Sequence, residues 1–322
     1  MHDALKEDTS IVLIREVQEI YERLDRPGKV GRDIADLFPV KWVRVRLEDV
    51  ADKKGETEFI QIVIPGRQGS SSGGHAETLG VIGRLGGVGA RPLIRGLVSD
   101  GDGALVALSV ALKLARMHAL GDVLEGDVIV ATHVRTDAPV LPMKPVDFMD
   151  TPIELETILK LEVATDMDAI LSIDTSRGNR LLNRNGFAIT PTVKEGWILK
   201  VSDDLLRVME HTTGSLPAAF PITMQDIVPY VGDVYHINSL MQPAVVTRAP
   251  VVGIALTAAG SVPGCASGVS NPFRVEEVGR FVVECAQQFG RGEIAFYDWE
   301  EFARLRAMYG DMHRLQSIAD VA

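Results

Sequence analysis

Histidine and aspartate side chains stand at the ends of several expected strands and at the start of one expected helix. His75 lies in "SSSGGHAETLG", after a strand and a flexible Ser/Gly run, and His133 lies near the end of the apolar run "VIVATHV". Asp174 follows "AILSI", whereas Asp100 and Asp102 occupy "SDGDG" just before the apolar helix "ALVALSVALKLARM". Ligand sites in open α/β sheets gather beyond the carboxyl ends of the strands. Imidazole and carboxylate groups bind zinc, manganese or cobalt, so these residues predict a site for a divalent metal.

Each of these residues also has a purely structural interpretation. Asp and Gly are common turn formers, so "SDGDG" can be a simple turn in which Asp102 caps the following helix. His75 can bond to backbone in its loop, and Asp174 can turn the chain into "TSRGN". For His133, and for His236 in "GDVYHINSL", a hydrogen-bonded structural histidine is the favoured interpretation.

The elements that must position these residues follow from hydrophobic periodicity. The runs "GDVIVATHV", "DAILSID" and "APVVGIALTA" are nearly continuous aliphatic segments, typical of strands covered on both faces. Amphipathic helices are expected in "IVLIREVQEIYERL", "NPFRVEEVGRFVVECAQQF" and "WEEFARLRAMYG", and a hairpin in "VKWVRVRLEDV" with "EFIQIVIPG". The alternation predicts an α/β fold with three layers, α/β/α, around a mixed and mostly parallel central sheet.

No internal repeat, low-complexity tract or clear linker divides the sequence. We therefore expect a single α/β domain over residues 1–322, with the N-terminal helix and hairpin (1–66) packed on its core. A boundary in the glycine-rich stretch 66–89 is the alternative.

Composition excludes some classes of partner. The formal net charge of −11 and the pI of about 5.2 argue against nucleic acid and anionic membranes, because both attract basic surfaces. A cationic or zwitterionic small ligand fits this charge better. The two cysteines are too few for a disulfide framework, and no apolar stretch reaches the length of a membrane span. The start of the chain shows no targeting signal, so we expect a cytoplasmic protein.

Order and spacing of the motifs give a resemblance. "GGHAETLG", then "GLVSDGDGALVALSVALKL", then "LEGDVIVATHV" resemble the opening of the co-catalytic zinc aminopeptidase and carboxypeptidase superfamily. The resemblance implies that His75 is the first metal ligand, with Glu77 as the acid that orients it. It makes Asp100 the aspartate that bridges two metals, with Gly103 as its loop glycine, and Asp174 a later ligand. The implied fold is of the phosphorylase/hydrolase type.

This sequence departs from that superfamily where a Glu-Glu pair should follow the third segment. The segment "HVRTDAP" contains no glutamate, so the base that activates water is missing, and Asp137 is the nearby candidate to replace it. His133 could add a ligand, whereas the charge of Arg135 would repel a metal and suits substrate contact. The late histidine ligand is also missing, and His236 is the candidate replacement. For Arg184 a solvated surface position is the favoured interpretation, and bidentate hydrogen bonds to a substrate carboxylate are the alternative.

The segments "VSDGDGA", "SIDTSRGNRLLNRNGFAITPT" and "YHINSLMQPAV" further resemble a bacterial family of unknown function related to those peptidases. Together, these features predict a metal-dependent hydrolase of peptide or acyl-amide bonds in small substrates, with a degenerate active site. Zinc is the first expectation for the metal, with manganese or cobalt as alternatives. The rival is a catalytically inactive relative, without metal, that binds a ligand or serves in assembly. A weaker third interpretation is a metal-free enzyme that uses Cys265 or His236. By resemblance we also expect a homo-oligomer and a small peptide or amino-acid-derived ligand.

Overall fold

The structure is a computed structural model of the chain. It describes residues 11–26, 28–39, 41–91, 94–135, 140–142, 148–176, 181–223, 230, 234–259 and 268–316.

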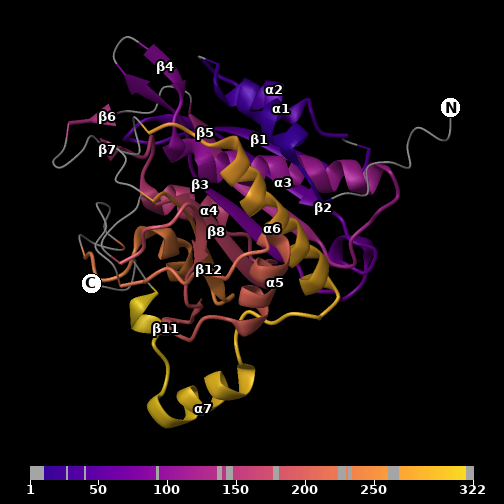
Figure 1. Ribbon diagram of the computed structural model, residues 1–322, viewed down its shortest axis with the longest axis vertical. Coiled ribbons are helices and arrows are strands. Elements are labelled where there is room, and N and C mark those ends of the chain that lie inside the picture. The colour runs from indigo at the N-terminus through magenta and orange to yellow at the C-terminus, as the bar shows by residue number, and fades with distance from the viewer. Residues whose placement is uncertain are drawn as a thin grey trace.

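A ten-stranded mixed sheet forms the centre of the molecule (Figure 1). Its strands run in the order β1-β2-β5-β3-β8-β12-β10-β11, with β4 paired to β3 and β9 paired to β12. The strands β5, β3, β8 and β12 are parallel to one another and form the middle of the sheet, whereas the outer pairs are antiparallel. The bounds are β1 (Arg44–Ala51), β2 (Glu56–Ile64), β3 (Leu79–Arg91), β4 (Ile94–Leu97), β5 (Val128–Arg135), β8 (Ala169–Thr175), β9 (Gly186–Ile189), β10 (Val193–Lys194), β11 (Trp197–Ile198) and β12 (Val251–Thr257). A separate two-stranded sheet contains β6 (Val140–Leu141) and β7 (Phe148–Met149).

Helices cover both faces of this sheet. One face packs against α1 (Ile14–Leu24), α3 (Asp102–Ala119), α5 (Asp203–Thr213) and α6 (Pro272–Gly290), which share one hydrophobic core with the strands. The other face packs against α4 (Leu155–Glu162) and the 3₁₀ helix η3 (Ser239–Val245), around a second core. The remaining helices are α2 (Gly31–Ala35), α7 (Trp299–Tyr309) and the 3₁₀ turns η1 (Ser70–Ser72), η2 (Ser99–Gly101) and η5 (His313–Leu315). The expected three-layer α/β/α fold is confirmed.

Helix α3 explains why two aspartates precede such an apolar segment. A helix that is hydrophobic all round belongs in the interior, and α3 is buried from Asp102 to Ala115 between α1, α6 and the sheet. Its first turn lies against β3, because a Cβ on Gly83 would stand 2.7 Å from the carbonyl oxygen of Gly103. The "SDGDG" turn is therefore buried because the helix that follows it packs in the interior.

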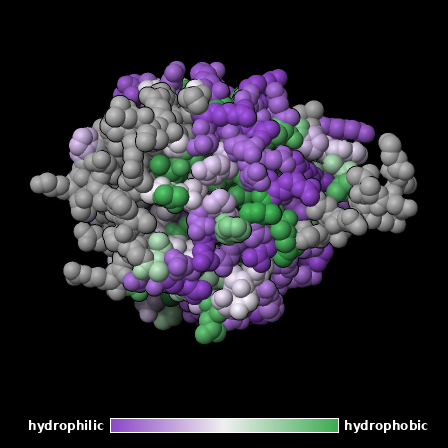
Figure 2. All heavy atoms as spheres, turned by 45° about the horizontal axis from the view of Figure 1, so that its top comes forward, coloured by the Kyte–Doolittle hydropathy of each residue, from purple (hydrophilic) through white to green (hydrophobic). Residues whose placement is uncertain are grey.

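The N-terminal elements extend the central sheet. The β1–β2 hairpin joins it through antiparallel pairing of β2 with β5, and α1 lies beside α3 and α6. Figure 2 shows one face of the molecule, on which hydrophilic residues predominate and hydrophobic residues gather in small groups. None of the helices that the structure describes is both long and apolar enough to cross a membrane.

Candidate functional site at the carboxyl ends of the parallel strands

Three polar side chains come directly after the last position at which β3 pairs with both of its neighbouring strands. Gly83 of β3 pairs with Thr132 of β5 and with Ile173 of β8. The next residue along each strand is Arg84 in β3, His133 in β5 and Asp174 in β8. Side chains alternate between the faces of a strand, and neighbouring strands are about 4.8 Å apart. Arg84, His133 and Asp174 thus project side by side from the face of the sheet that α4 and η3 cover.

A buried ion-pair network surrounds the middle residue of the three. Arg84, 4% exposed, donates from Nη1 to Oε2 of Glu162 at 2.8 Å and from Nη2 to the side-chain oxygen of Gln242. The second oxygen of Glu162 lies 3.1 Å from Nδ1 of His133, and Glu162 itself is fully buried. Among the described residues, Arg84 Nε has no hydrogen-bond partner. Glu162 comes from the end of α4 and Gln242 from η3, so three elements converge on one guanidinium.

This network does not fit a divalent metal. A guanidinium stays charged at every physiological pH, and in a buried site its repulsion of a second cation is weakly screened. The carboxylate of Glu162 already neutralises Arg84. Within the described part of the chain, no group of three or more His, Cys, Asp or Glu side chains could hold a metal ion.

The "SDGDG" loop lies at the same edge of the sheet. Asp100 and Asp102 are 5% and 4% exposed, in η2 and at the start of α3. Ser270, just before α6, donates its hydroxyl to Asp102. The Thr175 hydroxyl, at the end of β8, donates to the carbonyl oxygen of Ser99 at 2.5 Å. The loop is therefore fixed between β8 and the start of α6.

Burial gives Asp102 an unusual protonation equilibrium. It raises the pKa of Asp102 to about 7 from an ordinary value of 3.8, and the hydrogen bond from Ser270 offsets part of this shift. Between these two pH values the folded protein keeps a proton that the unfolded chain has released. Raising the pH therefore lowers the stability across this window, and the loss is complete above the folded pKa.

Asp102→Asn is expected to remove this pH dependence. Wild type should lose stability relative to the variant between pH 5 and 7, by at most about 1.4 kcal/mol per pH unit. Urea unfolding at several pH values measures the difference. Asp298→Asn is the control, because Asp298 is exposed and the N–H of Glu301 lowers the pKa of Asp298, so its titration lies below the window. Parallel pH profiles for wild type and Asp102→Asn would contradict the shifted pKa.

His75 and Glu77 lie at the opposite edge of the sheet. Both are exposed and precede β3, and the N–H of Thr78 donates to Asp168, just before β8, at 2.8 Å. The predicted cluster of His75 and Glu77 with the aspartates of the carboxyl edge is therefore wrong for the described residues. His75 does follow a strand, but that strand, β2, runs antiparallel to β5, so the chain leaves it beside the amino ends of the parallel strands. The pKa of Glu77 is raised by partial desolvation of its carboxyl group against the neighbouring protein, and then by the charge of Asp168.

The other predicted site residues are scattered. His236 is exposed, and its ring lies edge-on to that of Tyr230 at 5.5 Å between centroids. Arg184 is half-buried and donates to the carbonyl oxygen of Leu216 at 2.8 Å. Asp137 and Cys265 lie outside the described residues. Arg135 ends β5, but its side chain also lies outside what the structure describes.

Sequence reasoning missed Arg84, Glu162 and Gln242. A charged residue within the apolar strand segment "LGVIGRL" is a signal that could have identified Arg84, because a strand covered on both faces leaves no solvated position for it. Glu162 and Gln242 carry no comparable signal. They lie 78 and 158 residues along the chain from Arg84, and only the fold brings them to it.

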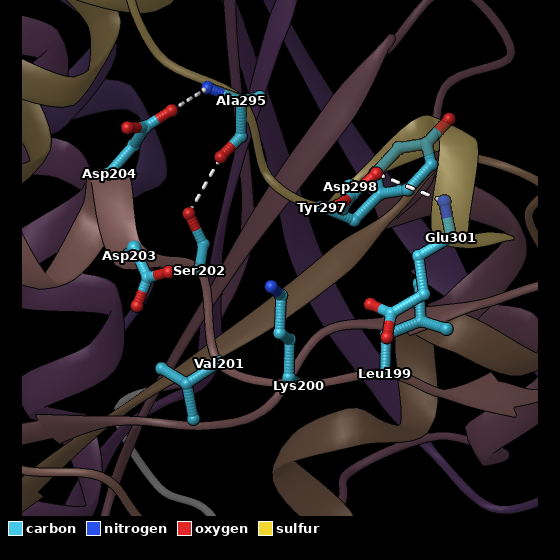
Figure 3. Close-up of a pocket in the computed structure, with 10 residues that line it drawn as sticks. All are labelled: Leu199, Lys200, Val201, Ser202, Asp203, Asp204, Ala295, Tyr297, Asp298 and Glu301. Atoms are coloured by element: carbon cyan, nitrogen blue, oxygen red, sulfur yellow. Dashed lines mark hydrogen bonds between the residues drawn. The ribbon is translucent and has the colours of Figure 1, made fainter.

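A second polar site is a small pocket of about 210 Å³ between the starts of α5 and α7 (Figure 3). Three of its polar side chains form hydrogen bonds to backbone. Asp204 accepts from the N–H of Ala295 at 2.9 Å, Ser202 donates to the Ala295 carbonyl at 2.6 Å, and Asp298 accepts from the N–H of Glu301 at 3.0 Å. The two bonds to Ala295 fasten the segment before α7 to the start of α5, and the bond from Glu301 to Asp298 caps α7. The pocket is lined by Leu199, Lys200, Val201, Ser202, Asp203, Asp204, Ala295, Tyr297, Asp298 and Glu301.

The sandwich of a mixed sheet between helices is a fold that this protein shares with an aminopeptidase. A mutant of tomato leucine aminopeptidase superposes with a TM-score of 0.51 and 12% sequence identity, over 84% of this chain and 61% of that one. This chain thus spans less than two thirds of that enzyme's length. Residues 48–319 match a family described as "Protein of unknown function (DUF1177)", and the chain belongs to this family. No curated protein matches this chain. The likeness to peptidases is established at the level of the fold.

Proposed function

We propose that this protein binds a small peptide or amino-acid-derived ligand at the carboxyl ends of β5, β3 and β8, without a divalent metal at this edge. The observation that carries the proposal is the buried Arg84 of β3, which comes directly after the last β3 position that pairs with β8 and is paired with Glu162 and Gln242. A metal ion in this position would have to displace the Arg84 guanidinium or lie close to its positive charge. The inactive, ligand-binding interpretation of the sequence is therefore the one that the geometry supports best.

Four features support a ligand of this class. The carboxyl ends of parallel strands are where α/β folds bind small molecules, and the aminopeptidase likeness points to peptides and their derivatives. The net charge of −11 favours ligands that carry an ammonium group. Asp174, the last residue but one of β8, supplies a carboxylate of the right sign at this edge.

A metal-dependent hydrolase is the second candidate, with zinc, manganese or cobalt as the metal. It is favoured by the position of Asp100 and Asp174, which do share the carboxyl edge. In that case Asp137 would serve as the base that removes a proton from water. His75 would have no part in it, because it lies at the opposite edge.

Metal content measured by plasma mass spectrometry separates the two candidates. Protein purified without a metal-affinity tag, then incubated with zinc, manganese or cobalt and desalted, is expected to hold far less than one equivalent. Near-stoichiometric metal that is lost in Asp100→Ala and Asp174→Ala, but kept in His75→Ala, would establish the hydrolase instead. A thermal-shift screen of dipeptides and N-acyl amino acids, with and without chelator, then tests the ligand. Stabilisation by a peptide that chelator leaves unchanged is the expected result, and a screen without any stabilising compound would contradict the proposal.

A further inference from the structure

Two buried polar atoms of the central sheet have no hydrogen-bond partner among the described residues. They are Nε of Arg84, in β3, and Oγ1 of Thr257, the last residue of β12. Arg84 is 4% exposed and Thr257 is 7% exposed. Buried polar groups in proteins are nearly always hydrogen-bonded, because an unpaired one has lost its bonds to water without a replacement. Exceptions to this rule concentrate at functional sites.

Both atoms belong to the face of the sheet that α4 and η3 cover. Arg84 and Asp174 directly follow the last pair of β3 and β8, so they lie at one level. Asp174 pairs with Ala255 of β12, and Thr257 stands two residues after Ala255, on the same face of its strand. Strands are about 4.8 Å apart and residues advance about 3.3 Å along a strand, so the Cα atoms of Arg84 and Thr257 are about 12 Å apart. Asp174 lies between them.

The order of these three side chains specifies the functional groups of a ligand. The Nε–H of Arg84 can only donate, so it requires an acceptor oxygen. The carboxylate of Asp174 attracts an ammonium group, and the hydroxyl of Thr257 can donate to a second oxygen. An α-amino acid has its carboxylate and its ammonium group on neighbouring atoms. With these two groups at Arg84 and Asp174, its side chain extends toward Thr257.

Length and charge narrow the class of side chain. Hydrogen bonds of about 2.9 Å at both ends leave about 6 Å between the two acceptor oxygens of the ligand. The extended five-carbon chain of glutamine has its terminal carbons about 5 Å apart, which matches this span. The far end of the ligand should be neutral, because Thr257 brings no positive charge and Glu162 already neutralises Arg84. A carboxamide meets this condition, whereas a second carboxylate would be buried near the negative charge of Asp174.

We propose that Thr257 determines the specificity of the ligand site, and that the site binds a free amino acid with a carboxamide side chain, for which glutamine has the matching length. Arg84 Nε donates to the α-carboxylate, Asp174 accepts from the ammonium group, and Thr257 donates to the carboxamide oxygen. This inference rests on the proposed function, because it names the class of ligand that binds at the strand ends. It also extends the site from β5, β3 and β8 to β12.

Isothermal titration calorimetry with L-glutamine and L-norleucine tests the specificity. Wild type should bind glutamine at least about tenfold more tightly, because norleucine ends in a methyl group and leaves the buried hydroxyl unpaired. Thr257→Val should abolish this preference by weakening glutamine binding while norleucine binding is kept. L-glutamate should bind wild type more weakly than glutamine, because its second carboxylate meets no cation.

Stability measurements show whether the Thr257 hydroxyl is unpaired within the protein. Thr257→Val should leave the midpoint of urea unfolding unchanged or raise it, since valine removes a buried hydroxyl without breaking a bond. Thr192→Val is the matched control. Thr192 is also buried, but its hydroxyl donates to the carbonyl oxygen of Phe296 at 2.6 Å, so its loss should lower the midpoint.

Several outcomes would overturn this inference. They are equal affinity of wild type for glutamine and norleucine, a Thr257→Val variant that keeps the preference, or one that unfolds as early in urea as Thr192→Val. Wild type that binds none of the three amino acids would overturn it as well. If dipeptides still stabilise the protein in that case, the proposed function stands without this specificity. If they do not, both fail.

Discussion

Arg84→Met is expected to lower the free energy of unfolding by about 3–5 kcal/mol, because removing one partner of a buried ion pair leaves the other charge buried and unpaired. In this protein the unpaired charge would be that of Glu162, which is fully buried and would keep, among the described residues, His133 beside it. The side-chain oxygen of Gln242 would lose the hydrogen bond from the guanidinium as well. Chemical denaturation at pH 7, with wild type and variant compared at constant ionic strength, measures the loss.

Two further variants show whether the loss has this cause. Arg84→Met combined with Glu162→Gln should recover most of the stability, because the amide is neutral and can still bond to His133. Arg32→Met removes an exposed arginine that pairs with Asp36 and should change stability by less than about 1 kcal/mol. If Arg84→Met proves as mild as Arg32→Met, Glu162 is not held as a buried ion and the argument against a metal at this edge fails.

Gly103→Ala is expected to destabilise the protein by about 3 kcal/mol, although alanine is normally the better helix former by about 1 kcal/mol. A Cβ at this position would lie 2.4 Å from the carbonyl oxygen of Ile173 and 2.6 Å from that of Arg84. Both contacts are to backbone in neighbouring strands, so no side-chain rotation relieves them. The start of α3 would have to move away from the sheet, and Asp100 and Asp102 would move with it.

Thermal and urea unfolding of Gly103→Ala beside Gly73→Ala separate a steric clash from ordinary glycine effects. Gly73 has a φ of 81°, and a Cβ added to it would meet no described atom within 4 Å. Its replacement therefore costs only the left-handed conformation, about 1–2 kcal/mol. If Gly103→Ala instead stabilised the protein, helix propensity alone would decide this position and the close packing of α3 on β3 and β8 would be wrong.

Local patterns were sufficient for the elements at the centre of the fold. Continuous aliphatic runs predicted β5, β8 and β12, because only strands covered on both faces can be apolar on both sides. The same reasoning placed His133 and Asp174 at strand ends, and the structure confirms their positions. The uniform hydrophobicity of α3 predicted its burial, and with it the burial of the two aspartates in its first turn and the preceding turn.

The predicted position of His75 was wrong because it depended on the direction of the preceding strand. A histidine after a strand looks the same whether that strand is parallel or antiparallel to its neighbours, and the antiparallel pairing of β2 put His75 at the wrong edge. Direction depends on which strands pair, and pairing depends on long-range burial rather than on the residues beside the turn.

The α/β class, the buried strands and helix, and the absence of the Glu-Glu pair from "HVRTDAP" thus follow from the amino-acid sequence. The contacts of Arg84 on the covered face of the sheet follow from the packing of distant elements. Arg84 meets Glu162 and Gln242 because α4 and η3 cover the same face of the sheet, although these residues are far apart in the chain. The hydrophobic periodicity of the sequence predicts whether a side chain is buried. The identity of its partners is set by the packing of whole elements, since a buried charge is tolerated only where the fold brings a compensating group to it.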